Sequence, residues 1–242
     1  MTLQDKMDSK EEVIMNYTLV LLSGGVGSRM QQSIPKQYML LAGKPMIMHI
    51  LDKVDKIEEI EKIIVVCAEE YRVSLNMMRE QYGIKTPITY ANAGESRQAS
   101  VLSGLKMVET DNVIIHEAAR PFVTVDDYKE LIDCPLENAM IGLDIPFTVL
   151  KGHDKVEGLL TRSELVNVQL PQKFNTKILL DAHKKAENEG MKFTEDASLL
   201  FYYNPEIPIK IIKGKDYNIK VTTRMDMLTG EIIYDEIFRR RK

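Results

Sequence analysis

Apolar runs of strand length recur along the chain and alternate with amphipathic stretches that have the period of a helix. The runs are "YTLVLL" (17–22), "KIIVVCA" (62–68), "ITYA" (88–91), "NVIIHEA" (112–118), "AMIGLDIP" (139–146) and "IPIKIIKG" (207–214). Continuous runs of Val, Ile and Leu suit strands that are covered on both faces. The alternation therefore predicts a three-layer α/β fold with a mostly parallel sheet, whose ligands bind beyond the carboxyl ends of the strands.

Three helices are expected between these strands, at residues 45–57, 96–108 and 175–190, the last ending at a glycine. We interpret residues 1–16 as a polar N-terminal extension and residues 17–242 as one domain. The stretch 144–172 breaks the alternation and carries the charged patch "KGHDK" and then "LVNVQLPQ". It predicts a protruding β-arm.

The overall charge makes a nucleic-acid partner unexpected. The net charge is -4 and the pI is about 5.7, whereas nonspecific binding of nucleic acid needs a basic face. The sequence has no apolar run of membrane-spanning length and no secretory leader pattern. Two cysteines far apart match no metal or redox motif, and Cys67 is expected to be a buried thiol. We therefore expect a cytoplasmic protein.

The glycine-rich stretch "SGGVGSRM" directly follows the first expected strand. It lacks the GxxxxGK[ST] pattern of a Walker A loop, and Met30 stands where a GxGxxG dinucleotide motif, as in an NAD-linked oxidoreductase, has its third glycine. Glycines there let the backbone N–H groups approach phosphate oxygens. Arg29 and Lys36 follow, and two cations of different geometry suit a small polyphosphate ligand. From the glycines alone, a strand-end turn with two solvated basic residues fits equally well.

The order of motifs along the chain resembles that of the cytidylyltransferases that act on 2-C-methylerythritol phosphate or ribitol phosphate. The matching segments are "GGVGSRM…PKQY", "GESRQASVLSGL", "HEAARPF", "QLPQ", "TEDAS" and "NIKVTT", between residues 17 and 227. The resemblance implies a Rossmann-like nucleotidyltransferase fold. It also implies transfer of CMP from CTP to a polyol phosphate with release of pyrophosphate, and Mg²⁺ bridging the nucleotide phosphates.

The resemblance also implies roles for individual residues. Arg29, Lys36 and Lys220 are the catalytic cations, because this transfer needs positioning and charge stabilisation more than a strong base. The expected CTP-binding residues are Gly24, Gly25, Gly27, Gly94, Arg97, Ser100, Glu117 and Ala118. Ser100 also reads as a helix-start residue. Arg120 is expected to tie its loop to a neighbouring carboxylate. No protein metal cluster is expected among the four scattered histidines, and His49 fits a core position.

Glu117, Arg162 and Thr194 are the residues implied for the acceptor. In the family the arm reaches into a second subunit, so a homodimer with a shared active site is implied. Three departures lie near the acceptor side: Glu117 replaces Asp, Leu170 replaces Thr, and Thr148 matches only with a gap. The phrases "HEAARPF" and "RQASV" favour methylerythritol phosphate, a precursor in isoprenoid synthesis. Ribitol 5-phosphate or another polyol phosphate stays open, as does a nucleotide-binding relative without catalysis.

Overall fold

The first strand, β1 (Tyr17–Leu22), lies inside a seven-stranded sheet with the order β11-β7-β10-β6-β1-β4-β5. The computed structural model describes residues 15–25 and 34–240. The other strands are β4 (Ile60–Cys67), β5 (Ile88–Asn92), β6 (Asn112–Glu117), β7 (Ala139–Asp144), β10 (Val166–Asn175) and β11 (Lys210–Lys213). β1 pairs in parallel with β4 and β6, β4 with β5, and β7 with β11, whereas β10 runs antiparallel to both neighbours. The expected α/β fold with a mostly parallel sheet is confirmed.

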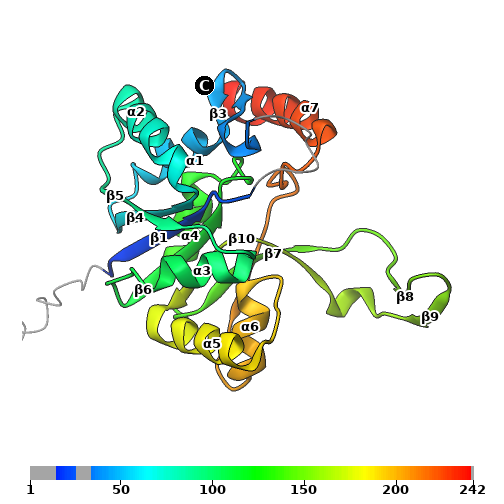
Figure 1. Ribbon diagram of the computed structural model, residues 1–242. Helices are drawn as coiled ribbons and strands as arrows, with labels where there is room; N and C mark the ends of the chain where they lie inside the picture. The colour runs from blue at the N-terminus through cyan, green and yellow to red at the C-terminus, as the bar shows by residue number, and fades with distance from the viewer. Residues whose placement is uncertain (1–14, 26–33, 241–242) are drawn as a thin grey trace, which may run out of the picture.

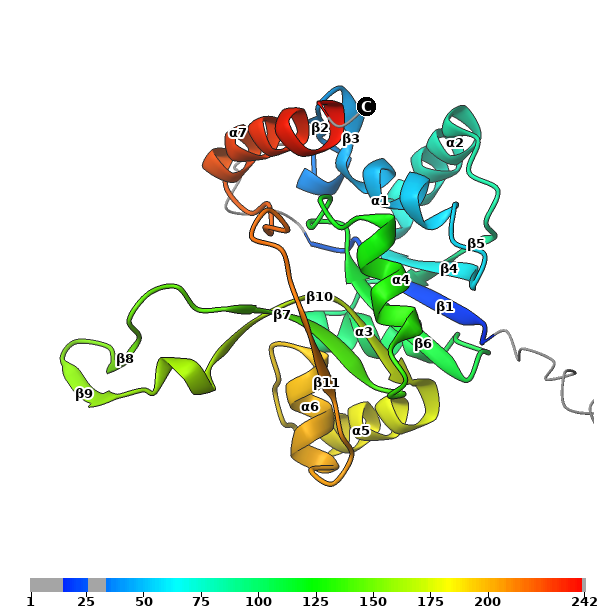
Figure 2. The same ribbon diagram turned by 180° about the vertical axis from the view of Figure 1, so that it is seen from behind.

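Helices cover both faces of the sheet, as Figures 1 and 2 show. The helices α1 (Met46–Val54), α2 (Arg72–Tyr82) and α4 (Val125–Asp133) pack on one face, and α3 (Arg97–Leu105), α5 (Thr176–Glu189) and α6 (Asp196–Tyr203) pack on the other. The helix α7 (Arg224–Ile233) and the following turn of π-helix, η6 (Tyr234–Arg239), pack beside α1. In the described part of the chain, no helix is long and apolar enough to cross a membrane.

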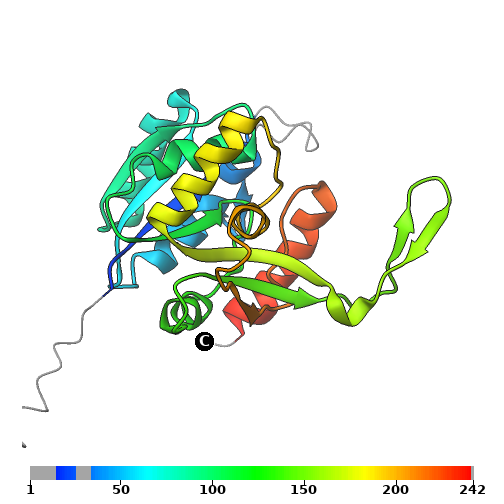
Figure 3. The same ribbon diagram turned by 90° about the horizontal axis from the view of Figure 1, so that it is seen from below.

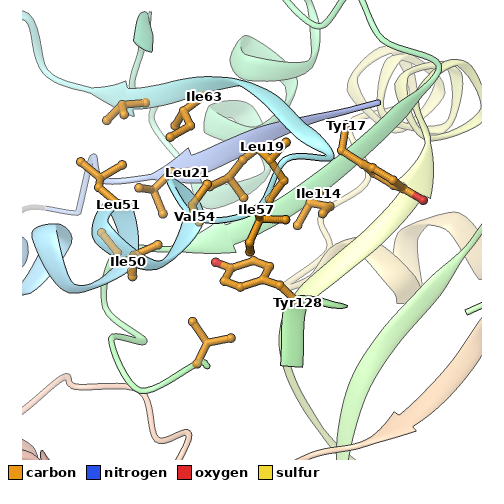
Figure 4. Close-up of a cluster of buried hydrophobic side chains, with 14 of the residues drawn as sticks. Tyr17, Leu19, Leu21, Ile50, Leu51, Val54, Ile57, Ile63, Ile114 and Tyr128 are labelled. Atoms are coloured by element: carbon orange, nitrogen blue, oxygen red, sulfur yellow. The ribbon is translucent and has the colours of Figure 1, made fainter. Parts of the chain in front are cut away.

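The apolar runs are continuous because successive residues of a strand enter different cores. Leu19 and Leu21 of β1 join the core beneath α1 and α4, as Figure 4 shows, whereas Val20 packs beneath α3. Cys67 is buried, and so is His49, whose Nε2 lies 2.7 Å from the carbonyl oxygen of Leu41. Both expectations for these residues are confirmed.

The strand β10 corrects one sequence interpretation. The sequence predicts that the phrase "LVNVQLPQ" belongs to the arm, but β10 continues into the middle of the sheet between β6 and β7. Leu170 is buried there, and Val166 and Val168 pack against the core of the same chain. Antiparallel pairing explains the difference. A parallel strand is usually preceded by a crossover helix, and that helix helps to predict the strand from sequence. An antiparallel strand such as β10 needs no helix before it, so this signal is missing.

The remainder of the excursion projects from the body, as Figure 3 shows. It carries the short strands β8 (Leu150–Gly152) and β9 (Val156–Leu159), which pair with each other, and the 3-10 turn η5 (Arg162–Glu164). The turn η3 (Lys36–Tyr38) and the two-residue strands β2 (Leu40–Leu41) and β3 (Lys44–Pro45) lead into α1, and η4 (Glu69–Tyr71) leads into α2.

Candidate active site

A pocket of about 370 Å³ opens at the carboxyl ends of β1 and β6, next to the first turn of α3. It is lined by Leu22, Ser23, Gly24, Gly25, Lys36, Gln37, Gly94, Glu95, Ser96, Arg97, Ser100, Glu117, Ala118, Ala119 and Lys220. The position follows from the parallel sheet, where the ends of neighbouring strands meet at one edge. Nine residues singled out from the sequence therefore converge: Lys36, Lys220, Gly24, Gly25, Gly94, Arg97, Ser100, Glu117 and Ala118.

Gly24 and Gly94 lie where the backbone passes close to other chain segments. A Cβ added to Gly24 would collide with the side chain of Ala93. A Cβ added to Gly94 would lie 2.6 Å from the Cβ of Ala99, well inside van der Waals contact. The rim of the pocket can therefore close tightly only with glycine at these two positions. Gly27 and Arg29 lie outside the described residues.

The glycine turn after β1 is fastened by Gln37. The side-chain nitrogen of Gln37 donates to the carbonyl oxygens of Ser23 and Gly25, the second at 3.1 Å. Binding these oxygens fixes the orientation of the peptide groups that line the pocket. No role for Gln37 is expected from the sequence, although this residue stands in the phrase "PKQY".

Lys36 and Lys220 enter the pocket from opposite ends of the chain. The ammonium group of Lys36 donates to the carbonyl oxygen of Val221 at 2.9 Å, and the Val221 N–H donates to Ala119 at 2.8 Å. The segment "NIKVTT" is thereby joined both to the loop before α1 and to the end of β6. These bonds bring the two lysines to one site despite their separation in sequence.

Glu117 forms the centre of a row of alternating charges. One carboxylate oxygen lies 2.9 Å from Arg97 Nε, and the other lies 2.6 Å from the Nζ of Lys220. Arg97 Nη2 contacts Asp196 at 2.7 Å, and the other oxygen of Asp196 lies 3.0 Å from His183 Nε2. The row joins β6, α3, α6 and α5 to the segment that carries Lys220.

The charge row sets the protonation of its carboxylates. Burial alone raises the pKa of Glu117, but the positive charges of Lys220 and Arg97 outweigh it and lower the pKa to about 2. Burial likewise opposes ionisation of Asp196, and Arg97 and His183 lower its pKa to about 2. The two carboxylates raise the pKa of the Arg97 guanidinium against the effect of its own burial. The pocket therefore keeps fixed charges across the neutral pH range.

Ser100 lies in the first turn of α3, as the interpretation of a helix-start residue expects, but it is not the N-cap. The N-cap of α3 is Ser96, whose hydroxyl accepts from Ala99 N–H, so Ser100 is not the capping residue. The Ser100 hydroxyl instead accepts from Gly94 N–H at 3.0 Å. This bond closes the segment 94–100 into a tight turn at the pocket.

Arg120 holds its loop through backbone oxygens. Its guanidinium donates to the carbonyl oxygen of Asn218 at 3.0 Å and to that of Val168 at 3.5 Å. The hydrogen bonds that hold the loop thus end on backbone oxygens, while the neighbouring carboxylate of Glu117 acts on Arg120 through its charge, which opposes the lowering of the Arg120 pKa by burial. Glu117 is engaged by Arg97 and Lys220, which leaves the carbonyl oxygens as the acceptors for Arg120.

Two expected acceptor residues lie away from this pocket within the chain. Arg162 lies in the projecting arm, where its guanidinium donates to the carbonyl oxygen of Pro146 at 3.1 Å. Thr194 is exposed in the loop before α6, and neither residue lines the pocket. Asp196 and His183 are functional residues that the sequence does not single out, although Asp196 stands inside "TEDAS". Burial of a charged pair cannot be read from such a motif.

Comparison with known proteins gives one family. The family model of 2-C-methyl-D-erythritol 4-phosphate cytidylyltransferase (IspD) matches residues 17–236. The protein of that name from Geobacillus thermodenitrificans is 35% identical over 226 residues, which cover 90% of this chain and 97% of the relative. The chloroplastic protein of that name from Oryza sativa is 32% identical, over 91% of this chain and 75% of the relative.

Solved structures agree with this assignment. The 2-C-methyl-D-erythritol 4-phosphate cytidylyltransferase of Francisella tularensis aligns with a TM-score of 0.74 at 26% identity, over 90% of this chain and 99% of that one. The 4-diphosphocytidyl-2C-methyl-D-erythritol synthase of Anaerococcus prevotii gives a TM-score of 0.81 at 24% identity, over 90% and 96%, which supports the fold. The chain therefore belongs to the family of 2-C-methyl-D-erythritol 4-phosphate cytidylyltransferases.

Proposed function

We propose that this nucleotidyltransferase transfers CMP from CTP to 2-C-methyl-D-erythritol 4-phosphate and releases pyrophosphate. An oxygen of the acceptor phosphate attacks the α-phosphorus of CTP, and the bond from that phosphorus to the bridging oxygen breaks. The electron pair leaves with pyrophosphate. The observation that carries the proposal is the convergence of Lys36, Lys220 and Glu117 on one pocket in a chain of this family.

The attacking oxygen is already anionic, so catalysis requires orientation and charge compensation rather than a general base. In our proposal Lys36 and Lys220 stabilise the negative charge that develops on the α-phosphoryl group and on the leaving pyrophosphate. The sequence motif assigns the same role to Arg29, which lies outside the described residues. Glu117 holds Lys220 at 2.6 Å and so fixes the ammonium group before the substrate arrives.

The turn between Gly94 and Ser100 supplies the proposed cytosine site. The bond between the Gly94 N–H and the Ser100 hydroxyl keeps this turn narrow, and the space beside Gly94 is too small for an added Cβ. A narrow site of this kind favours a pyrimidine over the larger purines. Ala118 and the glycines after β1 line the same pocket and are placed in our proposal along the nucleotide.

The pocket offers few side chains that could bind a metal ion, which fits a cation bound mainly by the substrate phosphates. Among the described residues, no three His, Cys, Asp or Glu side chains form a group that could bind a metal alone. The carboxylates that line the pocket are Glu95 and Glu117, and both oxygens of Glu117 face cationic side chains. Mg²⁺ keeps several waters and needs few protein ligands. We therefore propose that Mg²⁺ would be held mainly by the nucleotide phosphates, whose charge it would neutralise, and that Glu95 is the pocket carboxylate that could contribute a ligand.

The arm supports a homodimer whose acceptor site is shared between two copies. Its exposed apolar side chains are Phe147, Leu150, Val156, Leu159 and Leu160, with Phe147 76% and Leu159 83% exposed. A patch of this kind on a projecting hairpin is covered when a second copy packs against it. In such a dimer Arg162 would bind the acceptor phosphate in the neighbouring site, beside Thr194. We also propose a cytoplasmic location, in keeping with the two unpaired, buried thiols.

A panel of acceptors with CTP and Mg²⁺, followed by pyrophosphate release, tests the proposal. The panel holds 2-C-methyl-D-erythritol 4-phosphate, ribitol 5-phosphate, glycerol 3-phosphate and a control without acceptor. We expect release above the control with methylerythritol phosphate, and loss of release in the Lys36→Ala variant. Faster pyrophosphate release with ribitol phosphate than with methylerythritol phosphate would overturn the acceptor assignment. If none of the acceptors raises release above the control, the proposed function is overturned.

A further inference from the structure

The loop of residues 191–196 runs from the end of α5 up to and including Asp196, the first residue of α6, and carries Thr194, the proposed acceptor hydroxyl. Its first residue is fixed by the Met191 N–H, which donates to the carbonyl oxygen of Ala186 at 2.9 Å. At its other end Glu195 caps α6 by accepting from the N–H groups of Ala197 and Ser198. Thr194 itself is exposed, so its position depends on how the backbone between these two ends is held.

One side chain from α3 holds the middle of this loop. The oxygen of the Gln98 amide accepts from the Phe193 N–H at 2.8 Å, and its nitrogen donates to the carbonyl oxygen of Met191 at 3.1 Å. The two bonds use opposite ends of one amide group, so they fix both its position and its orientation. Phe193 is the residue before Thr194, and Gln98 does not line the nucleotide pocket.

The preceding residue of the same helix holds the end of the loop and also lines the nucleotide pocket. Arg97 contacts Asp196 at 2.7 Å and Glu117 at 2.9 Å. Two consecutive residues in the first turn of α3 thus contact the loop: Gln98 binds its middle, and Arg97 binds its last residue, Asp196. Arg97 and Gln98 therefore form a continuous set of contacts between the pocket and the loop.

We propose that Gln98 is a positioning residue for the acceptor: it holds the backbone before Thr194, so that the first turn of α3 couples the nucleotide pocket to the acceptor site. The inference rests on the proposed function, because it takes Thr194 as an acceptor contact. It differs from that function in assigning the position of Thr194 to a residue that touches neither substrate.

Three variants separate this role from a general effect on α3. Gln98→Leu removes both hydrogen bonds at similar side-chain size. Gln98→Glu keeps an acceptor for the Phe193 N–H but places a carboxylate against the carbonyl oxygen of Met191. Lys106→Met is the matched control, because it removes the exposed ion pair between α3 and Glu187 of α5, at 4.0 Å, without touching the loop.

Steady-state kinetics of each variant give KM values for CTP and for methylerythritol phosphate separately. We expect Gln98→Leu to raise the KM for the acceptor about tenfold and to change the KM for CTP less than about twofold, the effect of losing two neutral hydrogen bonds. Gln98→Glu should lie between wild type and Gln98→Leu, and Lys106→Met should match wild type. An unchanged acceptor KM, an equal rise in both KM values, or a lowered melting temperature alone would overturn the proposal.

Hydrogen exchange of the loop amides gives a second readout that does not depend on the acceptor. CTP should slow exchange at Phe193 in wild type, and the Gln98→Leu variant should exchange faster and lose this response. If no acceptor supports turnover, the proposed function fails and the exchange result decides the coupling. If CTP does not change exchange at the Phe193 amide in wild type, the proposed coupling between the nucleotide pocket and the loop is overturned.

Discussion

Replacing Glu117 by Gln tests the charge row at its centre. The side chain is 7% exposed and lies between the cationic groups of Arg97 and Lys220. Burial alone raises the pKa of this carboxyl group, but the two cations lower it from 4.5 to about 2. Gln has nearly the same shape and removes the charge, so the variant isolates the electrostatic contribution.

The size of the effect follows from the pKa. A shift of this size corresponds to about 3 kcal/mol of stabilisation of the ionised form in the folded state. Because the folded-state pKa is lowered, this contribution is complete above pH ~4.5 and is lost as the pH falls towards ~2. We expect Glu117→Gln to lower the free energy of unfolding by about 3 kcal/mol near neutral pH and by about 2 kcal/mol near pH 3.5.

Urea unfolding followed by circular dichroism measures both values, which suits a chain without Trp. Glu117→Asp is the matched control, because it keeps the charge and carries the residue that the family resemblance implies here. It should retain most of the stability and show the pH dependence of wild type. A Glu117→Gln variant as stable as wild type at both pH values would refute the assignment of this carboxylate as the centre of the row.

Three further outcomes are expected. CTP should be used well above UTP, ATP or GTP, and equal turnover with ATP would contradict a cytosine site between Gly94 and Ser100. Burial lowers the pKa of His49 to about 4 and that of His116 to about 3. Both side chains are buried in the neutral form, so the free energy of unfolding should fall as the pH drops below ~6.5, by about 2 kcal/mol for each histidine at pH ~5. A His116→Gln variant whose stability has the same pH dependence as that of wild type would contradict this. Arg162→Ala should raise the KM for the acceptor far more than that for CTP, and mixing it with Lys36→Ala should restore activity; no rescue despite subunit exchange would exclude a shared site.

Hydrophobic patterning was sufficient to predict the parallel part of the fold. The run "YTLVLL" coincides with β1, because both faces of that strand are buried, and its one polar side chain, Thr18, accepts a hydrogen bond from the Thr110 hydroxyl. Patterning was insufficient for β10, where Gln169, Gln172 and Lys173 are buried polar residues in the middle of the sheet. Lys173 is satisfied by the carbonyl oxygens of Ile132 and Cys134 at the end of α4, a pairing that only the fold creates.

The candidate site could be predicted where a motif carries its own chemistry. Motifs predict Lys36 and Lys220 as site residues, and both line the pocket. The contacts of Gln98, Asp196 and His183 could not be predicted in the same way. Each depends on which side chain lies opposite it across two packed helices, and spacing along one chain does not contain that information.

Lys220, whose ammonium group faces Glu117 in the pocket, is the residue on which the proposed reaction depends most directly. The measurement is the rate of pyrophosphate release with saturating CTP, Mg²⁺ and methylerythritol phosphate. It compares wild type, Lys220→Ala and the control Lys213→Ala, an exposed lysine at the end of β11. We predict that Lys220→Ala slows turnover by ~10²-fold or more with the fold intact, and that the control matches wild type. Near-normal turnover of Lys220→Ala would contradict the account.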